Sequence, residues 1–139
     1  MLDWERLKEI ANADGEFRLQ ARFWNATLKI ANGPDATRIA LRDGEITAVE
    51  PWFGGIGSDL AISAPPAQWD ALLAPVPKPF YQDLHAATVH HGFTAAGNRT
   101  HYCAYYPAVR RLIELMRELN NADETSPQTN ERAVAGRNR

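Results

Sequence analysis

Four histidines are the side chains in this sequence that most readily suggest chemistry: His85, His90, His91 and His101. Imidazole is the commonest ligand of transition metals and a frequent acid–base group near neutral pH. The spacing argues against a metal, because His85 and His90 are five positions apart rather than four, and the sequence contains no HExxH motif. We therefore predict no bound metal. A buried histidine that bonds to a neighbouring carbonyl stays open as the alternative to a catalytic one.

Three side chains are candidates for acid–base catalysis. His91 alternates with Val89 and Phe93, so on a strand it would point to the apolar side, which makes it the first candidate. His85 comes next, followed by Tyr106. A phenol or imidazole in a dry cavity can have a shifted pKa and can act as an acid or a base. Asp59 is offset by one position from Leu60, so we expect it to face outward in a structural role.

Three tyrosines lie on one stripe of a predicted C-terminal helix: Tyr102, Tyr105 and Tyr106. Each offers a large apolar ring with one polar tip, which suits a ligand that is mostly hydrocarbon with one oxygen. Ordinary core packing is an equally good interpretation of this stripe.

A sheet and several helices must position these side chains. Apolar residues lie two apart in four short runs, which predicts strands near 25–32, 36–42, 45–51 and 58–64. A fifth strand is predicted over 89–95. Turn signals at 32–35 and at Asp43-Gly44 indicate hairpins, so we expect mainly antiparallel pairing. Helices are expected over 2–12, after Asp14, from 66 to 73, from Phe80 to about 88, and from 102 to 119, where Pro107 should kink the helix or begin its main part. Residues 121–139 are nearly devoid of apolar side chains, which predicts one domain over 1–120 and a disordered tail over 121–139.

The sheet has a single apolar face, so the helices should cover that face, and aromatic residues gather where the two layers would meet. A glycine-rich loop carries Trp52, Phe53 and Ile56, either as a lid over an apolar site or as a plug at the end of the core. We expect an apolar cavity between the layers, with a ligand-binding wall built from these residues: Trp52, Phe53, Ile56, Trp69, Phe80, Leu84, Phe93, Tyr102, Tyr105 and Tyr106.

Composition narrows the possible classes of protein. The chain has 139 residues and a formal net charge of -2, and its basic residues form no stripe, which disfavours a nucleic-acid partner. The single cysteine suits a reducing compartment. The sequence shows neither a signal peptide nor an apolar run long enough to span a membrane, so we expect a soluble, cytoplasmic protein. P-loop, nucleophile-elbow and dinucleotide-binding motifs are absent, so we predict no cofactor.

Four sets of residues follow one another in an order typical of a known family: 12–17, 41–46, 58–63 with 69–73, and 92–98. None is a catalytic signature. Through them the sequence resembles the sterol carrier protein-2 like family of lipid-binding domains, over about residues 3–120. The resemblance implies an α+β fold: a five-stranded, mainly antiparallel sheet covered on one face by helices. It also implies an apolar cavity that takes sterols, fatty acyl chains or similar lipids.

Two functions follow as expectations. The first is binding, and in some settings transfer, of a lipophilic small molecule such as a sterol, a fatty acyl chain or a polyketide- or terpenoid-like compound. The alternative is a small cofactor-independent enzyme, such as an isomerase, hydratase or cyclase, that acts on an apolar substrate with a histidine or tyrosine acid–base. A homodimer is a further expectation, since small domains of this kind often pair.

Overall fold

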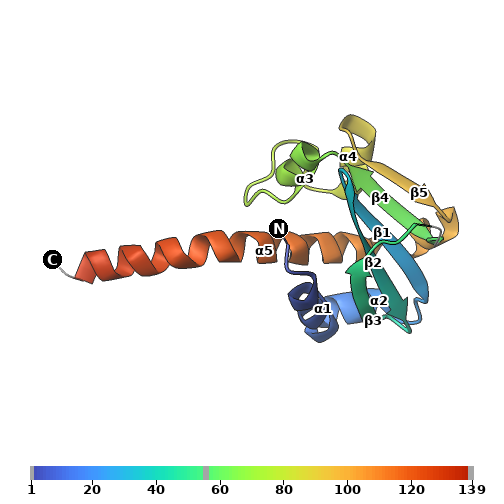
Figure 1. Ribbon diagram of the computed structural model, residues 1–139, viewed down its shortest axis with the longest axis horizontal. Coiled ribbons are helices and arrows are strands. Elements are labelled where there is room, and N and C mark those ends of the chain that lie inside the picture. The colour runs from blue at the N-terminus through green and yellow to red at the C-terminus, as the bar shows by residue number, and fades with distance from the viewer. Residues whose placement is uncertain (1, 55–56, 138–139) are drawn as a thin grey trace.

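The computed structural model describes residues 2–54 and 57–137, with side chains up to residue 122. The helices are α1 (Trp4–Ala13), α2 (Gly15–Ala21), α3 (Pro66–Leu72), α4 (Leu84–His90) and α5 (Arg99–Arg137); the strands are β1 (Ala26–Asn32), β2 (Asp35–Arg42), β3 (Glu45–Pro51), β4 (Leu60–Ala64) and β5 (Thr94–Gly97). The strands form one sheet, and the helices pack against one side of it (Figure 1). The predicted α+β class is confirmed.

The sheet has the strand order β3-β2-β1-β4-β5. Pairing is antiparallel except between β1 and β4, which run parallel, with Leu28 opposite Leu60 and Ile30 opposite Ile62. The sequence predicts a mainly antiparallel sheet, and this one parallel pair is the exception. It arises because β3 lies at the edge of the sheet, so the chain crosses β2 and β1 before it enters β4.

Two glycines are required where the backbone passes closest to other segments. The turn between β2 and β3 has positive φ at both Asp43 (55°) and Gly44 (80°), and a Cβ on Gly44 would lie 2.6 Å from the carbonyl oxygen of Ala21. Gly97 has φ 119°, and a Cβ there would lie 2.4 Å from the carbonyl oxygen of Asp59. Only glycine avoids these overlaps, so both turns depend on close contact with segments distant in the sequence as well as on their own positive φ.

The core forms between the apolar face of the sheet and the helices. Alternate residues of the central strands are at most a few per cent exposed, among them Leu28, Ile30 and Ile39. Helices α1, α2 and α5 supply the opposing layer with Leu7, Phe17, Leu112 and Met116, among others. The alternation read from the sequence therefore identifies the buried face correctly.

Two segments differ from the prediction. Phe80 does not begin a helix: its φ is 68°, and α4 starts only at Leu84. The strand expected over 89–95 is wrong for its first half, since Val89 and His90 end α4 and β5 begins at Thr94. Leu84 and Ala87 are both buried and lie three residues apart, as residues on one face of a helix do. Their burial favours a helix here, although the two-residue alternation of a strand also fits the sequence.

Helix α5 bends near its start. Tyr105 has a non-helical φ of −114° two residues before Pro107, which confirms the predicted kink. The helix then crosses the domain and continues to Arg137 (Figure 1). The division into a domain of 1–120 and a disordered tail of 121–139 stays a prediction.

Two arginines of α5 fasten it to the other helices. Arg111 forms a two-pronged ion pair with Asp14, with Nε 3.0 Å from Oδ2 and Nη2 2.9 Å from Oδ1. Asp14 also caps α2 by accepting a hydrogen bond from the backbone N–H of Phe17 at 2.8 Å. On the other side of α5, Arg117 donates from Nε and Nη2 to the carbonyl of Leu72, at 3.0 and 2.7 Å, and so satisfies the end of α3.

Replacing Arg111 should reveal how strongly the ion pair holds α5 in place. The hydrogen bond from Arg111 lowers the pKa of Asp14 below the ordinary aspartate value, so this stabilisation is present above about pH 4 and is lost as the pH falls through the lowered pKa. We expect Arg111→Met to reduce the free energy of unfolding by about 2 kcal/mol near neutral pH, as measured by urea denaturation.

The exposed neighbour Arg110 provides the matched control, because Arg110→Met removes the same charge from the same helix without breaking the pair. The loss in the free energy of unfolding caused by Arg111→Met should become smaller at about pH 3, where Asp14 begins to take up a proton. A loss of equal size at both pH values would contradict the role assigned to Asp14.

Candidate functional site

A partly apolar space between the sheet and the helices lies beside the first turn of α1. We call it the α1 hollow. It has a volume of about 470 Å³ and opens to solvent, and it is bounded by the start of α1, the start of β2 and the end of β3: Leu2, Asp3, Trp4, Glu5, Asp35, Ala36, Thr37, Val49, Glu50 and Pro51. Val49 pairs with the buried Ile39, so it lies on the helix-covered face of the sheet.

The local sequence explains why α1 leaves a space here. Asp3 caps α1 by accepting a hydrogen bond from the backbone N–H of Arg6 at 3.1 Å, which starts the helix at Trp4. At the other end, Asn12 bonds to Ile46 twice, at 2.9 Å each, and ties the helix to β3. Leu7 and Ala11 are fully buried, whereas Leu2, Trp4 and Val49 are only partly covered. The first turn of α1 therefore packs less completely than the rest of the helix.

Carboxylates surround this apolar floor. Asp3, Glu5, Asp35 and Glu50 all line the α1 hollow, and the described residues that line it include no lysine or arginine. Glu50 pairs with Arg38 at 2.6 Å, and Glu5 lies 3.5 Å from Lys8. The hollow therefore combines apolar and acidic side chains and has a volume in the range typical of small-molecule sites.

A second site brings together polar residues from α4 and α5. We call Asp83, His85, Tyr102 and Tyr106 the tyrosine cluster. The hydroxyl of Tyr106 donates to Oδ1 of Asp83 and accepts from the backbone N–H of His85 at 2.9 Å. Nδ1 of His85 lies 3.3 Å from the hydroxyl of Tyr102, and the two tyrosine rings pack edge to face at 5.4 Å. Two of the three predicted acid–base candidates, His85 and Tyr106, thus lie in one cluster.

Both phenols of the tyrosine cluster stay protonated at neutral pH. Burial, and then the hydrogen bond to Asp83, raises the pKa of Tyr106 well above that of a free phenol. Burial, and then the charge of Asp83, raises the pKa of Tyr102 as well. Raised pKa values make these groups hydrogen-bond donors and weak acids rather than bases.

A small hollow adjoins the tyrosine cluster. It has a volume of about 190 Å³ and is lined by His85, Thr88 and Tyr102 together with the end of β5 and the start of α5. The hydroxyl of Tyr106 already has two partners, so the Tyr102 hydroxyl and the His85 ring are the groups that remain to meet a molecule in this hollow.

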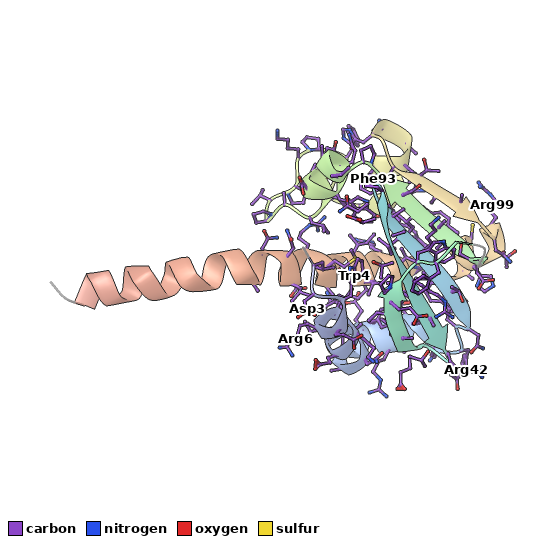
Figure 2. All side chains as sticks on the ribbon, in the orientation of Figure 1. Asp3, Trp4, Arg6, Arg42, Phe93 and Arg99 are labelled. Carbon is purple, nitrogen blue, oxygen red and sulfur yellow. The ribbon has the colours of Figure 1, made fainter. Side chains whose placement is uncertain are left out.

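The other predicted wall residues fall into different places. Trp69, Leu84 and Phe93 are buried in the core; the rings of Trp69 and Phe93 meet edge to face at 4.9 Å, and the Trp69 indole N–H donates to the carbonyl of Ala31 at 2.9 Å. Figure 2 shows Phe93 towards α3 and α4, well away from Trp4. These three side chains pack against the core in this structure, and the enclosed apolar cavity they were expected to line stays a prediction.

Trp52, the first residue after β3, lies on the opposite face of the sheet. The ring of Trp52 sits 4.9 Å from Nζ of Lys29, which alternates along β1 with the buried Leu28 and Ile30. Phe53 is 60% exposed, and Ile56 lies outside the described residues. The loop therefore does not plug the core between sheet and helices where it is described. Its role as a lid stays a prediction.

His91 does not point into the apolar layer. It is the C-cap residue that follows α4. Its ring stacks on Tyr81 at 3.7 Å, and its Nε2 lies 3.1 Å from the carbonyl oxygen of Pro79. This bond to a neighbouring carbonyl matches the structural alternative considered for the histidines. Phe80 is exposed and stacks on His90, while Tyr105 stacks on Trp24 at 4.7 Å, away from Tyr102 and Tyr106. The kink at Tyr105 separates it from the other two tyrosines.

His101 and Asp59 have structural partners. Nδ1 of His101 accepts a hydrogen bond from the indole N–H of Trp24 at 2.9 Å, and Oδ2 of Asp59 accepts from the backbone N–H of Thr27 at 2.8 Å. The structural role predicted for Asp59 is confirmed. Among the described side chains, those of residues 2–54 and 57–122, no three from histidine, cysteine, aspartate or glutamate come close enough together to hold a metal ion.

Sequence reasoning missed the lining of the α1 hollow and the partner of Tyr106. Leu2 and Trp4 lie on the apolar stripe of α1, a pattern that predicts packing and carries no sign that the packing is incomplete. Asp83 was overlooked because a helix was expected to run through it. Its place just before Leu84, at the N-cap of α4, was the signal available.

Comparison with known proteins bears on the fold. Neither a protein-family model nor a curated protein matches the sequence. Among solved structures, the chain is similar to sterol carrier protein 2, with a TM-score of 0.68 and 19% identity over 86% of this chain and 97% of that one. A conserved hypothetical protein from Thermus thermophilus, described as possibly a sterol carrier protein, gives a TM-score of 0.59 at 19% identity, covering 83% of this chain and 87% of its own.

The UbiJ-SCP2 ubiquinone synthesis protein gives a TM-score of 0.54 at 13% identity, covering 79% of this chain and 86% of that one. The chain therefore has the α+β fold of sterol carrier protein 2, as the sequence resemblance predicts. Across the described part of the chain, no helix is both long and apolar enough to cross a membrane.

Removing the Tyr106 hydroxyl should test the tyrosine cluster. Tyr106→Phe leaves Asp83 and the His85 N–H without this partner, so we expect a loss of about 2 kcal/mol in the free energy of unfolding near neutral pH. A phenol whose pKa is raised on folding contributes stability below the unfolded value of about 10 and loses it as the pH rises further. The difference in the free energy of unfolding between the unmodified protein and Tyr106→Phe should therefore become smaller above about pH 10.

Tyr105→Phe is the control, because among the described residues the Tyr105 hydroxyl has no hydrogen-bond partner within reach. The free energy of unfolding of both variants is measured by urea denaturation. Equal losses in the two would contradict a stabilising role for the Tyr106 hydrogen bonds.

Proposed function

We propose that this protein binds a lipophilic small molecule in the α1 hollow, between the helix and the sheet. The observation that carries the proposal is the solvent-open volume of about 470 Å³ bounded by Leu2, Trp4 and Val49, whose side chains are only partly covered. Ligand sites of this size, mostly apolar with a few polar groups, are typical of small-molecule binding. Sterols, fatty acyl chains and polyketide- or terpenoid-like compounds are the candidate ligands.

The fold supports this choice of ligand class. Two of the structural neighbours are named for a sterol carrier and for ubiquinone synthesis, and both names refer to molecules that are largely hydrocarbon. The same arrangement of a sheet with helices on one side offers this chain a space between the two layers. A ligand in the α1 hollow would bury the exposed parts of Leu2, Trp4 and Val49, and burial of apolar surface is favourable.

A filled hollow should not bind. We expect Val49→Trp, which adds a large side chain on the helix-covered face, to weaken binding of a fluorescent sterol or fatty acid by about tenfold or more, measured by the anisotropy of the probe. Thr47→Trp is the matched control, because it adds the same side chain to the same strand at an exposed position.

Comparison of the two variants with the unmodified protein distinguishes a wrong assignment of the binding site from a wrong assignment of the ligand class. Binding that Val49→Trp and Thr47→Trp leave equally intact would move the site elsewhere. If the unmodified protein binds neither probe, and native mass spectrometry of protein purified from its host finds no lipophilic passenger, the proposal fails.

The tyrosine cluster favours a second candidate function. We infer an acid–base enzyme that acts on an apolar substrate without a cofactor, with Tyr102 as hydrogen-bond donor to a substrate oxygen and His85 as the base. The supporting observation is the 3.3 Å approach of Nδ1 of His85 to the Tyr102 hydroxyl at the wall of the small hollow. A neutral phenol that donates to a carbonyl oxygen while an imidazole removes a neighbouring proton is an established catalytic arrangement.

Exchange of a substrate proton for deuterium would reveal such chemistry without knowledge of the product. In D₂O, apolar ketones should exchange the hydrogen next to the carbonyl in the presence of the protein, as followed by proton NMR. We expect Tyr102→Phe and His85→Gln each to slow exchange by about a hundredfold. His91→Ala should leave it unchanged, because His91 stacks on Tyr81 instead. Equal rates in all variants would remove the tyrosine cluster from any mechanism.

A further inference from the structure

The loop between α3 and α4 exposes apolar side chains that the proposed ligand site does not use. Within residues 76–89, Val76 is 84% exposed, Phe80 is 47% exposed and Val89 is 64% exposed. Lys78 and His90 lie among and beside them in the sequence. Phe80 stacks on His90, which directly follows Val89, and Val76 and Lys78 come from the same loop as Phe80; we call these five residues the proline-loop patch. The loop lies at the margin of the molecule, away from α1 and α2 (Figure 1).

The backbone holds the patch outward. Phe80 has φ 68°, a conformation that is strained for a bulky side chain, and its ring stacks on His90 at 3.9 Å. The next residue, Tyr81, is anchored instead: its hydroxyl donates to Gln68 at 2.8 Å, and its carbonyl accepts from Arg117 at 3.1 Å. Prolines at 75, 77 and 79 limit the freedom of the intervening residues. The exposure of Phe80 is therefore fixed by the fold.

The charge of the patch is opposite to that of the whole chain. No aspartate or glutamate occurs from residue 71 to residue 82, whereas the chain has a formal net charge of -2. Lys78 lies in this stretch, and His90 and His91 follow shortly after it. The nearest acidic residue on the C-terminal side, Asp83, is hydrogen-bonded to Tyr106. The patch thus combines exposed apolar side chains with the positive charge of Lys78.

We propose that the proline-loop patch docks this protein onto the surface of an anionic lipid bilayer. Phe80, Val76 and Val89 enter the boundary between headgroups and acyl chains, and Lys78 contacts the anionic headgroups. A bilayer accepts a few separate apolar side chains without a complementary shape. A stable protein interface needs about 800 Å² from each partner, and three side chains interrupted by prolines and a lysine do not make a continuous apolar surface of that kind. This docking role is additional to the proposed ligand site.

The chain contains a close match to Phe80 for use as a control. Phe23 also has a positive φ, 69°, and is 72% exposed, but it follows α2 on another part of the molecule. Asparagine tolerates positive φ better than phenylalanine, so Phe80→Asn and Phe23→Asn should both fold. Each change removes one exposed aromatic ring at the same backbone conformation.

Co-sedimentation with vesicles tests the proposal. We expect the unmodified protein to bind vesicles of phosphatidylcholine with phosphatidylserine more tightly than vesicles of phosphatidylcholine alone. Phe80→Asn should weaken binding by about tenfold, and Phe23→Asn by less than about twofold. Lys78→Glu should abolish the preference for the anionic vesicles.

Three results would overturn the proposal: no binding of the unmodified protein to anionic vesicles, equal binding to both kinds of vesicle, or equal weakening by the two asparagine variants. The affinity of Phe80→Asn for the fluorescent sterol or fatty acid in solution, measured in the same preparations, distinguishes a failure of docking from a failure of the ligand site. That affinity should match the affinity of the unmodified protein.

Discussion

Burial of the single apolar face of the sheet is the interaction on which the other features of this structure depend. Leu28, Ile30, Ile39, Leu60 and Ile62 project to one side, and water is excluded there only when helices cover them. The covering layer comes from both ends of the chain, with α1 and α2 before the sheet and α5 after it. The core is therefore complete only when segments from opposite ends of the sequence come together.

Helix α5 is the element that joins the parts. Its buried stripe packs on the sheet, while Arg111 binds Asp14 at the corner between α1 and α2, and Arg117 donates to the last carbonyl of α3. Near its start, Tyr106 bonds to Asp83 and to the backbone of α4. Each contact uses a polar group at the margin of an apolar stripe, so α5 sets the spacing of the helices as well as covering the sheet.

Two of the places where this covering layer is incomplete are the sites of the proposed binding and catalytic functions. At the first turn of α1, the helix leaves the α1 hollow between itself and strands β2 and β3. Between α4 and α5, polar side chains meet at a smaller hollow. A layer packed to the usual density of a protein interior has few empty spaces, so each of these two hollows is informative about binding.

Local signals in the sequence were enough to predict much of the fold. Two-residue alternation marked β1, β2 and β4 and their buried sides, Asp43-Gly44 marked a tight turn, Asp14 marked the start of α2, and Pro107 marked the bend in α5. It failed in β3, where an irregularity in the register brings Ile46 and Val49, three residues apart, to the helix-covered face. These features depend on a few adjacent residues, since steric limits on φ and ψ and the period of each element act locally.

The candidate site was much less accessible, because it depends on contacts between distant segments. Trp69 and Phe93 have the composition expected of a cavity wall, yet they fill the core, while Leu2, Trp4 and Val49 look like core residues and line a hollow. Alternation fits His91 to a strand, but the burial of Leu84 and Ala87 against the rest of the domain places it at the end of a helix. Sequence patterns specify which side of an element is apolar, whereas only the packed tertiary structure decides whether that side meets another side chain or an open space.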